Sequence, residues 1–410
     1  MDWADREHAV CLQAADSTTR VASVLPQQPD ALAAWALALQ QRFGGRPVGV
    51  CLEQSRGPVV YALSAYPWLV LYPVNPRSLA AFRLAFHPSR SKSDPTDAEL
   101  LCELLRTHPQ QLHPWQAEDT ATRTLRGLLE QRDKLVDDRT RLSHRLRAAL
   151  KLVFPQALDW AGPLTQPVSW AFLLQWPSLT VLQQATPEDL RAFCGAHHIR
   201  RGARCQTLQA QIQVAQPLGT DTAVLEPTVL LIDTLCRQLQ VLHAGIVAHD
   251  RAIAALFAQH PERALFAGLP GAGSVLAPRL LVAFGADRAR YADACVLQQL
   301  SGIAPVVERS GHQCWTHWRW SAAPVLRQTF HEYALHSLAK SAWARAYYQL
   351  QRRRGKGHQA AVRALAFKWI RVLWRCWQSQ TPYDEARYTE ALRRQQSPLL
   401  ELLPAPKEAA

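Results

Sequence analysis

The sequence predicts an α/β domain at the N-terminus, a long helical hairpin in the middle and a mostly helical domain at the C-terminus. Short apolar runs between polar turns indicate the first domain. Leucines repeated every seven residues indicate the hairpin, and a Gly/Pro loop followed by Trp- and Arg-rich segments indicates the third part. The chain has 410 residues, of which 48% are hydrophobic, so it can bury more than one core.

Two apolar runs, at residues 8–12 and 20–25, predict adjacent antiparallel strands because a polar turn separates them. A succession of strand, helix and strand follows, which is typical of an α/β domain. We expect this domain to occupy residues 1–115. Its later elements are a helix at 31–43, a strand at 47–53, a further helix and a strand at 68–73.

Leucines recur every seven residues from Leu128 through Leu142 among many charged residues, which predicts a long helix of coiled-coil type. A second apolar stripe between about residues 228 and 257 predicts a helix that pairs antiparallel with the first. The predicted hairpin spans residues 116–262, holds residues 156–222 at its tip and favours self-association. Its second helix is expected to bury Leu231, Leu235, Leu239, Leu242 and Ile246.

The composition changes beyond Pro261, where a Gly/Pro loop leads into helices rich in tryptophan and arginine. We expect a third domain over residues 263–385. Residues 386–410 end in a Pro- and Ala-rich stretch and are expected to form a disordered tail.

The charge balance favours a polyanionic partner. The chain carries 46 Lys and Arg against 33 Asp and Glu, a formal net charge of +13, which suits nucleic acid better than an acidic metabolite. A basic membrane-surface protein has a similar charge, but no uninterrupted run of about 18 apolar residues occurs. Residues 1–5 do not form a signal peptide. We therefore expect a cytosolic protein.

The nine cysteines are an odd number and contain no CxxC pair, so the sequence predicts no disulfide framework. This cysteine usage agrees with a reducing compartment. Most are expected to be buried thiols. A zinc site at one loose cluster is the weaker alternative, since no second close pair follows it. The cluster comprises Cys194, His197, His198 and Cys205.

Four acidic residues, Asp2, Glu53, Asp94 and Asp97, lie beside predicted strand ends or a helix start. Two divalent ions about 4 Å apart need several carboxylates from different elements, which this placement can supply. Pro95 suits the first helical position, so Asp94 is expected as N-cap and Asp97 on the same face one turn later. An ordinary capping arrangement is the alternative. Oxygen ligands favour Mg2+ or Mn2+ over zinc.

At these residues the chain resembles the IS-one-ten family of insertion-sequence transposases, which are bridge-RNA-guided DNA recombinases. Asp2-Trp3-Ala4 is similar to the setting of the family's first Asp, and Glu53 stands where its Glu ends a later strand. Residues 74–77 resemble its Asn-Pro stretch, and residues 92–98 resemble its paired-Asp motif. The resemblance implies an RNase H/RuvC-like domain of DEDD type, in which Asp2, Glu53, Asp94 and Asp97 are catalytic and bind metal.

Two segments depart from the family pattern. Only Met1 precedes Asp2, so the strand that delivers the first carboxylate is expected to be short: either the start lies further upstream or the strand begins at Asp2. Asp5 is a substitute candidate for this ligand. Residues 318–323 stand where the family tends to have a Lys-x-Gly-Asn-like turn.

The C-terminal half is similar to the same family at residues 269–273, at residues 300–305 and at Ser310-Gly311. The resemblance implies that Ser310 is a nucleophile that attacks the scissile phosphate and holds the broken strand covalently. It also implies that Ser310 of one subunit completes the acidic site of another, in a dimer or tetramer. By the same resemblance, an element-encoded structured RNA chooses donor and target DNA. Without the resemblance, Ser310 would be interpreted as an ordinary turn residue, because Ser-Gly is a common turn pair.

Several features suit contact with nucleic acid. The glycine turn at residues 270–273 leads into a helix and exposes backbone N–H groups that can bind a phosphate. An ordinary turn at the start of a helix has the same sequence pattern and is the alternative. Basic side chains cluster at residues 352–356 and along one face of the next helix. Trp315, Trp318 and Trp320 either stack on bases or belong to a core. The expected contacts are Lys92, Gly271, Gly273, Arg309, Arg327, Arg352, Arg353, Arg354, Lys356, Lys368, Arg371 and Arg375.

These observations together predict a site-specific DNA transposase that uses Mg2+ or Mn2+ and acts at the bacterial nucleoid. A junction nuclease is the first alternative: water would attack, and Ser310 would be a turn residue. The second is a non-catalytic nucleic-acid-binding relic, which binds in a salt-sensitive way and does not cleave.

Overall fold

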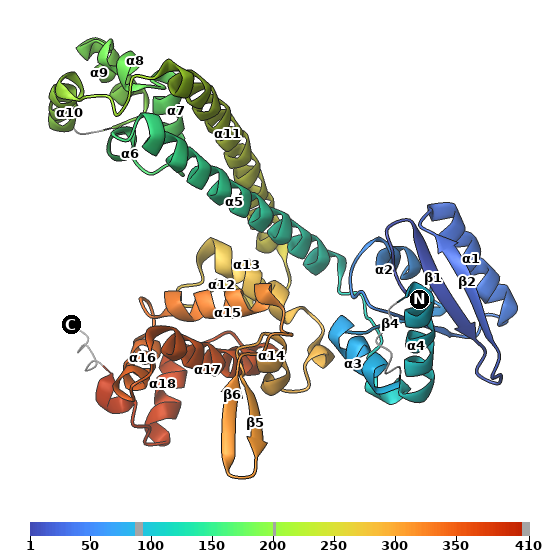
Figure 1. The fold of residues 1–410 in the computed structure, drawn as a ribbon. Helices are drawn as coiled ribbons and strands as arrows, with labels where there is room; N and C mark the ends of the chain where they lie inside the picture. The colour runs from blue at the N-terminus through green and yellow to red at the C-terminus, as the bar shows by residue number, and fades with distance from the viewer. Residues whose placement is uncertain (87–92, 200–201, 404–410) are drawn as a thin grey trace. The chain divides into compact units, whose positions relative to one another are not determined.

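A computed structural model describes residues 1–86, 93–199 and 202–403 of the chain (Figure 1). The chain divides into two units, Met1–Glu118 and Asp119–Ala410, and each is described by itself. Lys92, an expected nucleic-acid contact, lies outside the described residues.

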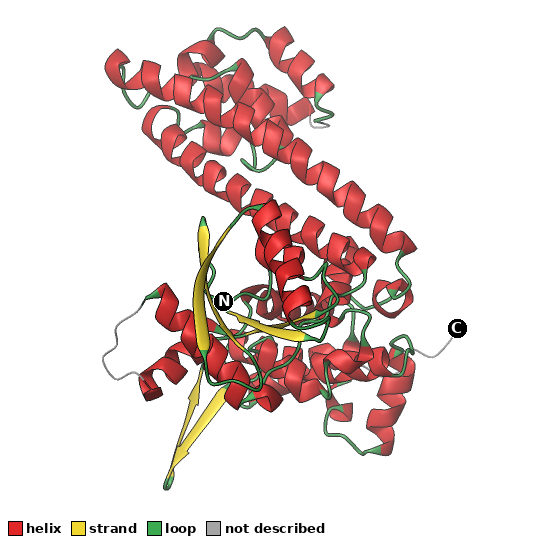
Figure 2. Cartoon of the chain, turned by 90° about the vertical axis from the view of Figure 1, so that its right-hand side faces the viewer, coloured by secondary structure: helices red, strands yellow, loops and turns green. Residues whose placement is uncertain are grey.

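The N-terminal unit contains two two-stranded sheets (Figure 2). β1 (Glu7–Gln13) pairs antiparallel with β2 (Arg20–Pro26), which confirms the two adjacent strands predicted there. β3 (Val48–Leu52) pairs parallel with β4 (Leu69–Pro73). A parallel pair needs a crossover connection, and α2 (Pro58–Leu63) lies in it.

Helices cover both faces of β3. α1 (Pro29–Arg42) belongs to the core in which Val50 is buried, and α4 (Asp94–Thr107) belongs to the core in which Cys51 is buried. Successive side chains of a strand point to opposite faces, so one short apolar strand contributes to two cores. The unit is completed by α3 (Pro76–Phe86) and η1 (Pro109–Gln111).

A long helical hairpin begins the C-terminal unit. α5 (Thr120–Val153) starts after Asp119, whose carboxylate accepts a hydrogen bond from the Thr122 N–H at 2.8 Å. α11 (Thr222–Gln259) starts in the same way after Asp221. This cap begins α11 before the apolar stripe that predicted the helix.

The two helices run antiparallel, as predicted. The Arg132 guanidinium donates to Asp250 at 2.5 Å, and the Thr122 hydroxyl lies 3.0 Å from the His260 ring nitrogen. Residues nearer the N-terminus of α5 therefore contact residues nearer the C-terminus of α11 and the residue that follows it. Figure 1 shows the two helices side by side along the hairpin.

The tip of the hairpin is a small helical domain with its own core. Phe172, Trp176 and Phe193 pack edge to face on one another, with the Trp176 and Phe193 ring centres 5.1 Å apart. The tip is thus a folded body rather than a loop. Its helices are α6 (Ala157–Trp160), α7 (Pro167–Gln175), α8 (Leu179–Gln183), α9 (Pro187–Ala196) and α10 (Gly202–Val214).

The stripe that α11 buries differs in part from the predicted one. Leu231 is 37% exposed, whereas its neighbour Ile232 is fully buried. The prediction for Leu231 was therefore wrong, while Leu235, Leu239 and Ile246 are buried as predicted. The physical reason is that α11 packs on α7 as well as on α5 near the tip, and the buried face follows both neighbours.

Apolar side chains also point outward from α11, and Val241 is 74% exposed. Within the described residues, α11 is the one helix whose length and composition suit a membrane span. An apolar helix of a helical hairpin meets the same criteria. The outward-facing side chains leave α11 a surface for a further contact.

Aromatic residues fill the core of the remaining helices. Trp343, Trp369 and Trp377 are fully buried, and the indole N–H groups of Trp369 and Trp377 donate to Ser337 Oγ at 2.9 Å and to the Gly285 carbonyl at 2.7 Å. Satisfied indoles of this kind make a rigid platform. The elements are α12 (Arg263–Ala267), α13 (Gly273–Phe284), η2 (Arg288–Arg290), α14 (Ala294–Leu300), β5 (Val306–Ser310), β6 (Gln313–His317), α15 (Pro324–Ser337), α16 (Ala342–Arg353), α17 (His358–Gln378), α18 (Glu385–Arg394) and η3 (Leu400–Leu402).

The expected disordered tail contains ordered structure. α18 and η3 lie within residues 386–403, and Leu392 and Leu399 are buried in the core of the C-terminal unit. The prediction of a disordered tail was wrong for this stretch, because these two leucines anchor it. Residues 404–410 lie outside the described residues.

Gly271→Ala is expected to lower the free energy of unfolding by about 3 kcal/mol. Gly271 has a φ of 81°, and a Cβ there would lie 2.6 Å from the His336 carbonyl oxygen on α15. Gly273→Ala is the matched control, since Gly273 also has a positive φ, 57°, but open space around it. Urea unfolding followed by circular dichroism compares them, and equal losses would contradict the packing argument.

Candidate active site and nucleic-acid interface

Asp2 lies between β1 and β3. Its N–H donates to the Ala9 carbonyl at 2.8 Å in an antiparallel bridge, and the Met1 ammonium donates to the Cys51 carbonyl at 2.8 Å. Asp2 is 8% exposed. These two contacts fix the backbone at Asp2 between the two strands.

The other three acidic residues come from β3 and α4. Glu53 directly follows β3 and is half-buried, at the strand end where it was expected. Ser93, not Asp94, has the extended backbone of the helix cap, with φ −147° and ψ 149°. The prediction of Asp94 as N-cap was wrong by one residue, because Pro95 occupies the second helical position rather than the first. Asp94 is consequently exposed, whereas Asp97 is 1% exposed.

Arg83 on α3 holds Asp97 through a bidentate ion pair. Its Nε donates to Asp97 Oδ1 at 2.8 Å, and its Nη2 donates to Oδ2 at 2.6 Å. A buried carboxylate without a cation is costly, so this guanidinium offsets the burial of Asp97 and fixes the direction of its carboxylate. The sequence analysis missed Arg83, and no local pattern marks it as a partner of a residue on the next helix.

The four carboxylates act on one another electrostatically. Burial raises the pKa of Asp2 to about 6, and the negative charges of Glu53, Asp97 and Asp94 act in the same direction. Carboxylates that repel one another form a donor set that a divalent cation neutralises, and oxygen donors suit Mg2+ or Mn2+. Among the described residues, no three His, Cys, Asp or Glu side chains lie close enough together to hold a metal ion as they stand. The four residues fit a divalent cation by their chemistry.

Asp2→Asn is expected to stabilise the metal-free protein at neutral pH. The folded pKa of Asp2, about 6, exceeds its ordinary value of 3.8, so the folded state binds this proton more tightly. The stabilising effect of the proton is complete below pH 3.8 and is lost as the pH rises through 6. At pH 7.5 we expect the variant to be more stable by about 1 to 2 kcal/mol, with a smaller difference at pH 4. Urea unfolding at both pH values measures this, and a pH-independent difference would contradict it.

Ser310 lies at the turn of an exposed β-hairpin. β5 and β6 pair antiparallel, with Ser310 opposite Gln313 across a two-residue turn. Gly311 in this turn has a φ of 58°, as hairpin turns of this length require. Figure 2 shows the hairpin extending away from the helices of its own unit. The Ser310 side chain is therefore accessible to a large substrate.

Two arginines hold Trp318 at the base of this hairpin. The guanidinium carbons of Arg327 and Arg363 lie 4.5 and 4.2 Å from the centre of its ring. The Arg327 guanidinium also donates to a backbone carbonyl of the same loop at 2.7 Å, so this residue has a structural role. By contrast, Trp315 and Trp320 are exposed, and Trp320 by 73%. Exposed indoles of this kind are available for stacking.

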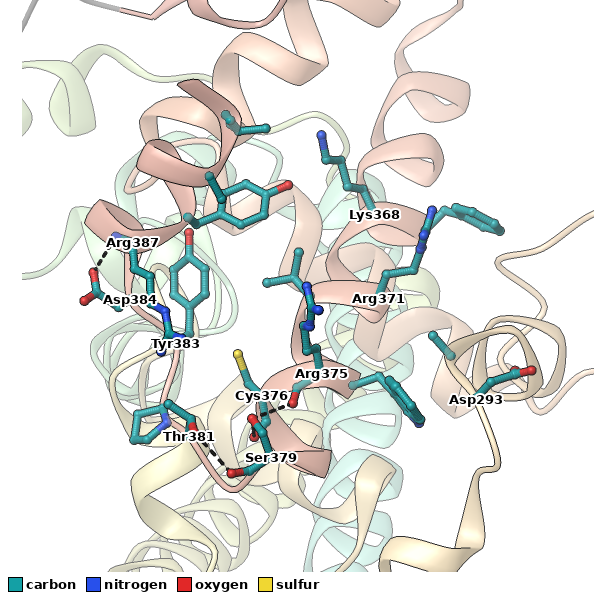
Figure 3. A pocket seen from close by; sticks show the side chains of 18 of the residues that line it. Asp293, Lys368, Arg371, Arg375, Cys376, Ser379, Thr381, Tyr383, Asp384 and Arg387 are labelled. Atoms are coloured by element: carbon teal, nitrogen blue, oxygen red, sulfur yellow. Dashed lines mark hydrogen bonds between the residues drawn. The ribbon is translucent and has the colours of Figure 1, made fainter. Parts of the chain in front are cut away.

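A basic pocket of about 1220 Å³ lies along α17 and α18 (Figure 3). The predicted basic face of α17 opens into it, and Tyr383 and Arg387 lie across from that face in Figure 3. Burial lowers the pKa of Lys368, whose ammonium lies 4.8 Å from the centre of the Tyr347 ring. Four basic side chains against two acidic ones give the pocket a net positive charge. They are Lys368, Arg371, Arg375 and Arg387, against Asp293 and Asp384.

The other expected nucleic-acid contacts lie apart from this pocket. Gly273 is the first residue of α13 and is exposed, whereas Gly271 packs against α15. Arg309 is exposed on β5. The exposed side chains at the end of α16 and in the turn after it are Arg352, Arg353, Arg354 and Lys356.

The weak zinc candidate lies at the end of α9. The His197 ring stacks on Phe193, with ring centres 4.4 Å apart, and His198 has a φ of 53°. The side chain of Cys205 lies outside the described residues. None of the described cysteines, Cys194 included, forms a disulfide.

Two family models match the chain. One, described as a transposase of the DEDD type for IS110, matches residues 1–155. The other, described as the transposase of the IS116/IS110/IS902 family, matches residues 263–349. The first match includes all four acidic residues, and the second includes Ser310.

The chain is also similar to proteins of bacterial insertion elements. It is 28% identical to the mini-circle protein of Streptomyces coelicolor predicted to be the transposase for IS117, over 94% of this chain and 95% of that protein. It is 29% identical to the uncharacterized 42 kDa protein of insertion element IS900 of Mycobacterium paratuberculosis, over 73% and 75%. It is 28% identical to the uncharacterized 43.6 kDa protein of insertion element IS110 of S. coelicolor, over 75% and 76%.

Proposed function

Because the chain belongs to the IS110 family of insertion-sequence transposases, which cleave and rejoin DNA, we propose that it does so with Ser310 and a metal-binding acidic quartet. The quartet is Asp2, Glu53, Asp94 and Asp97. The observation that carries the proposal is the repulsion that the other three carboxylates exert on Asp2. The N-terminal unit is then an RNase H/RuvC-like domain.

Ser310 is the nucleophile in this proposal. Its oxygen attacks the phosphorus of the scissile phosphodiester, a serine–phosphate bond forms, and the bond from phosphorus to the deoxyribose oxygen breaks. The serine proton ends on the released hydroxyl. One phosphodiester replaces another, so the bond is conserved for rejoining. The exposed turn supports this role, because Gly311 places no side chain beside the attacking oxygen.

The acidic quartet would hold Mg2+ or Mn2+, which supplies positive charge to the phosphate when bound. Asp2 is set in place by the backbone bridge to β1. Glu53 is set by the end of β3, and Asp97 by the ion pair with Arg83. Arg83 is therefore a positioning residue that orients the Asp97 carboxylate.

The basic pocket along α17 supports contact with the nucleic-acid backbone. Lys368, Arg371 and Arg375 attract phosphate, and Tyr383 in the same pocket offers a ring to a base. Trp315 and Trp320 offer two further exposed rings. Selection of donor and target by a structured RNA, in the bacterial cytosol at the nucleoid, belongs to the proposal through the family resemblance.

Self-association through the hairpin completes the proposal. The exposed Leu230 and Val241 on α11 supply apolar surface for a second copy. Ser310 of one subunit then acts with the acidic quartet of another, in a dimer or tetramer.

The test is a covalent-adduct assay. The purified protein is incubated with its element RNA, labelled donor and target DNA, and Mg2+ or EDTA. We expect an adduct that is sensitive to protease and forms only with the metal ion. Cleavage without an adduct would replace this mechanism by a nuclease that uses water. Salt-sensitive binding without cleavage would identify a non-catalytic relic.

A further inference from the structure

Arg363 on α17 lies at the base of the serine-bearing hairpin and has no partner of opposite charge. Its guanidinium carbon lies 4.2 Å from the centre of the ring of Trp318, the residue that directly follows β6. Within the described part of the chain, this half-buried guanidinium has no hydrogen bond and no ion pair. Stacking on a ring leaves the N–H donors in the plane of a guanidinium unused. Arg363 therefore keeps donors that no protein group occupies.

Arg327 on α15 places a second cation against the same ring. Its guanidinium carbon lies 4.5 Å from the ring centre, so the carbons of Arg327 and Arg363 are no farther apart than the sum of their distances from Trp318. Arg327 donates from Nη2 to the Arg319 carbonyl at 2.7 Å but has no ion pair with a described residue. Burial lowers the pKa of Arg363, and the charge of Arg327 acts in the same direction. The two positive charges are thus close together and uncompensated.

A glycine provides the space that Arg327 occupies. Gly302 has a φ of 67°, and a Cβ there would lie 2.9 Å from Arg327 Nη2 and 2.6 Å from Ala322 Cβ. Any side chain at this position would displace the guanidinium from the ring of Trp318. The close approach of Arg327 to this backbone therefore depends on the glycine of the segment at residues 300–305.

The acidic residue nearest to this pair is already neutralised. Burial lowers the pKa of His331, and the positive charges of Arg363 and His358 act in the same direction. The charge of Glu332 acts in the opposite direction, but its carboxylate pairs with Arg279 at 2.6 Å. The surroundings of Arg363 are therefore positive, and an anion from outside the protein is the partner that they favour.

From these contacts we propose that Arg363 and Arg327 bind one backbone phosphate of the DNA strand that Ser310 attacks. This site rests on the proposed function. A guanidinium binds two oxygens of a phosphate through paired N–H donors, which suits the unused donors of Arg363.

The length of β5 sets the position of this phosphate. The strand runs from Val306 at the base of the hairpin to Ser310 at the turn. At about 3.4 Å per residue, Ser310 lies about 14 Å from the base. Successive phosphates of a duplex strand are about 3.4 Å apart along the helix axis, so the bound phosphate lies about four nucleotides from the scissile one.

The first experiment measures the salt dependence of binding to a DNA duplex that carries the element end, in EDTA. Arg363→Gln should lower the slope of log Kd against log salt concentration by about 0.9 and weaken binding by about 10-fold. Arg393→Gln is the matched control, because it removes the same charge from an arginine already paired with Glu390. It should leave the slope unchanged.

Arg363→Lys separates charge from packing, since it keeps the charge but lacks the paired donors. It should keep the wild-type slope and bind less tightly than the wild type. A wild-type slope in Arg363→Gln, whatever its thermal midpoint, would overturn the inference and leave Arg363 as a support for Trp318.

The second experiment changes the DNA instead of the protein. A neutral methylphosphonate replaces one phosphate at a time in the strand that is cut, again in EDTA. Binding of the wild-type protein should weaken at a phosphate about four nucleotides from the cut, and Arg363→Gln should be insensitive there and nowhere else. Equal sensitivity of both proteins at every position would contradict the site.

The same scan on the element RNA tests the other source of phosphate. Sensitivity that depends on Arg363 only in the RNA would overturn the assignment to DNA. All of these readouts are binding measurements without a metal ion. The absence of a covalent adduct would therefore count against the proposed function and leave these results as they stand.

Discussion

Ser310→Ala is expected to abolish the covalent protein–DNA adduct and to lower strand exchange by about 1,000-fold or more. The substitution removes the oxygen that forms the serine–phosphate bond. Folding should be unaffected, because Ser310 is exposed at a hairpin turn. The measurement is adduct formation on a denaturing gel, together with DNA binding, which should stay at the wild-type level.

Ser321→Ala is the matched control for this variant. Ser321 is also an exposed serine and follows the same hairpin in sequence. It should form the adduct at the wild-type rate. An undiminished adduct in Ser310→Ala, or an equal loss in both variants, would remove Ser310 from the role of nucleophile.

Glu53→Gln is expected to lower metal-dependent cleavage by about 100-fold or more. It removes one negative charge from the acidic quartet while keeping the size of the side chain. Mg2+ should raise the thermal midpoint of the wild-type protein by mass action, and this rise should be smaller in Glu53→Gln. Cleavage rate against Mg2+ concentration, with a thermal scan of each protein, measures both effects.

Asp2→Asn and Asp5→Asn identify the first carboxylate of the site. Asp2 is buried and shares its electrostatic surroundings with the other three acidic residues, whereas Asp5 is exposed. We expect Asp2→Asn to behave as Glu53→Gln does and Asp5→Asn to cleave like the wild type. The reverse order would assign the first ligand to Asp5.

The regular elements could be predicted because they follow local periodicity. The two apolar runs before residue 26 became β1 and β2, and the leucines from Leu128 through Leu142 lie on α5. Boundaries were less predictable, since they depend on single caps. The N-caps are Ser93 for α4 and Asp221 for α11, so both helices start earlier in the sequence than predicted.

Contacts between distant elements could not be predicted. Nothing local to Arg83 indicates that it pairs with Asp97, because the contact depends on how α3 packs on α4. The sequence around Ser310 did contain a pattern typical of a β-hairpin, since β-branched and aromatic residues flank a Ser-Gly turn pair. The domain was nevertheless predicted to be mostly helical, because helical patterns surround this short segment. The positions of Ser310 and Glu53 relative to their elements were therefore predictable, and their partners were not.

The antiparallel course of α5 and α11 has a consequence for how such proteins diversify. The start of α5 and the end of α11 are buried in one core, through Leu125 and Ile253, while the tip has a core of its own. In chain terms the tip is an insertion between α5 and α11 that has a buried core of its own. The tip can therefore be lengthened, shortened or exchanged between related elements without rebuilding the serine-bearing domain, which makes it the part of the chain most open to acquiring new partners.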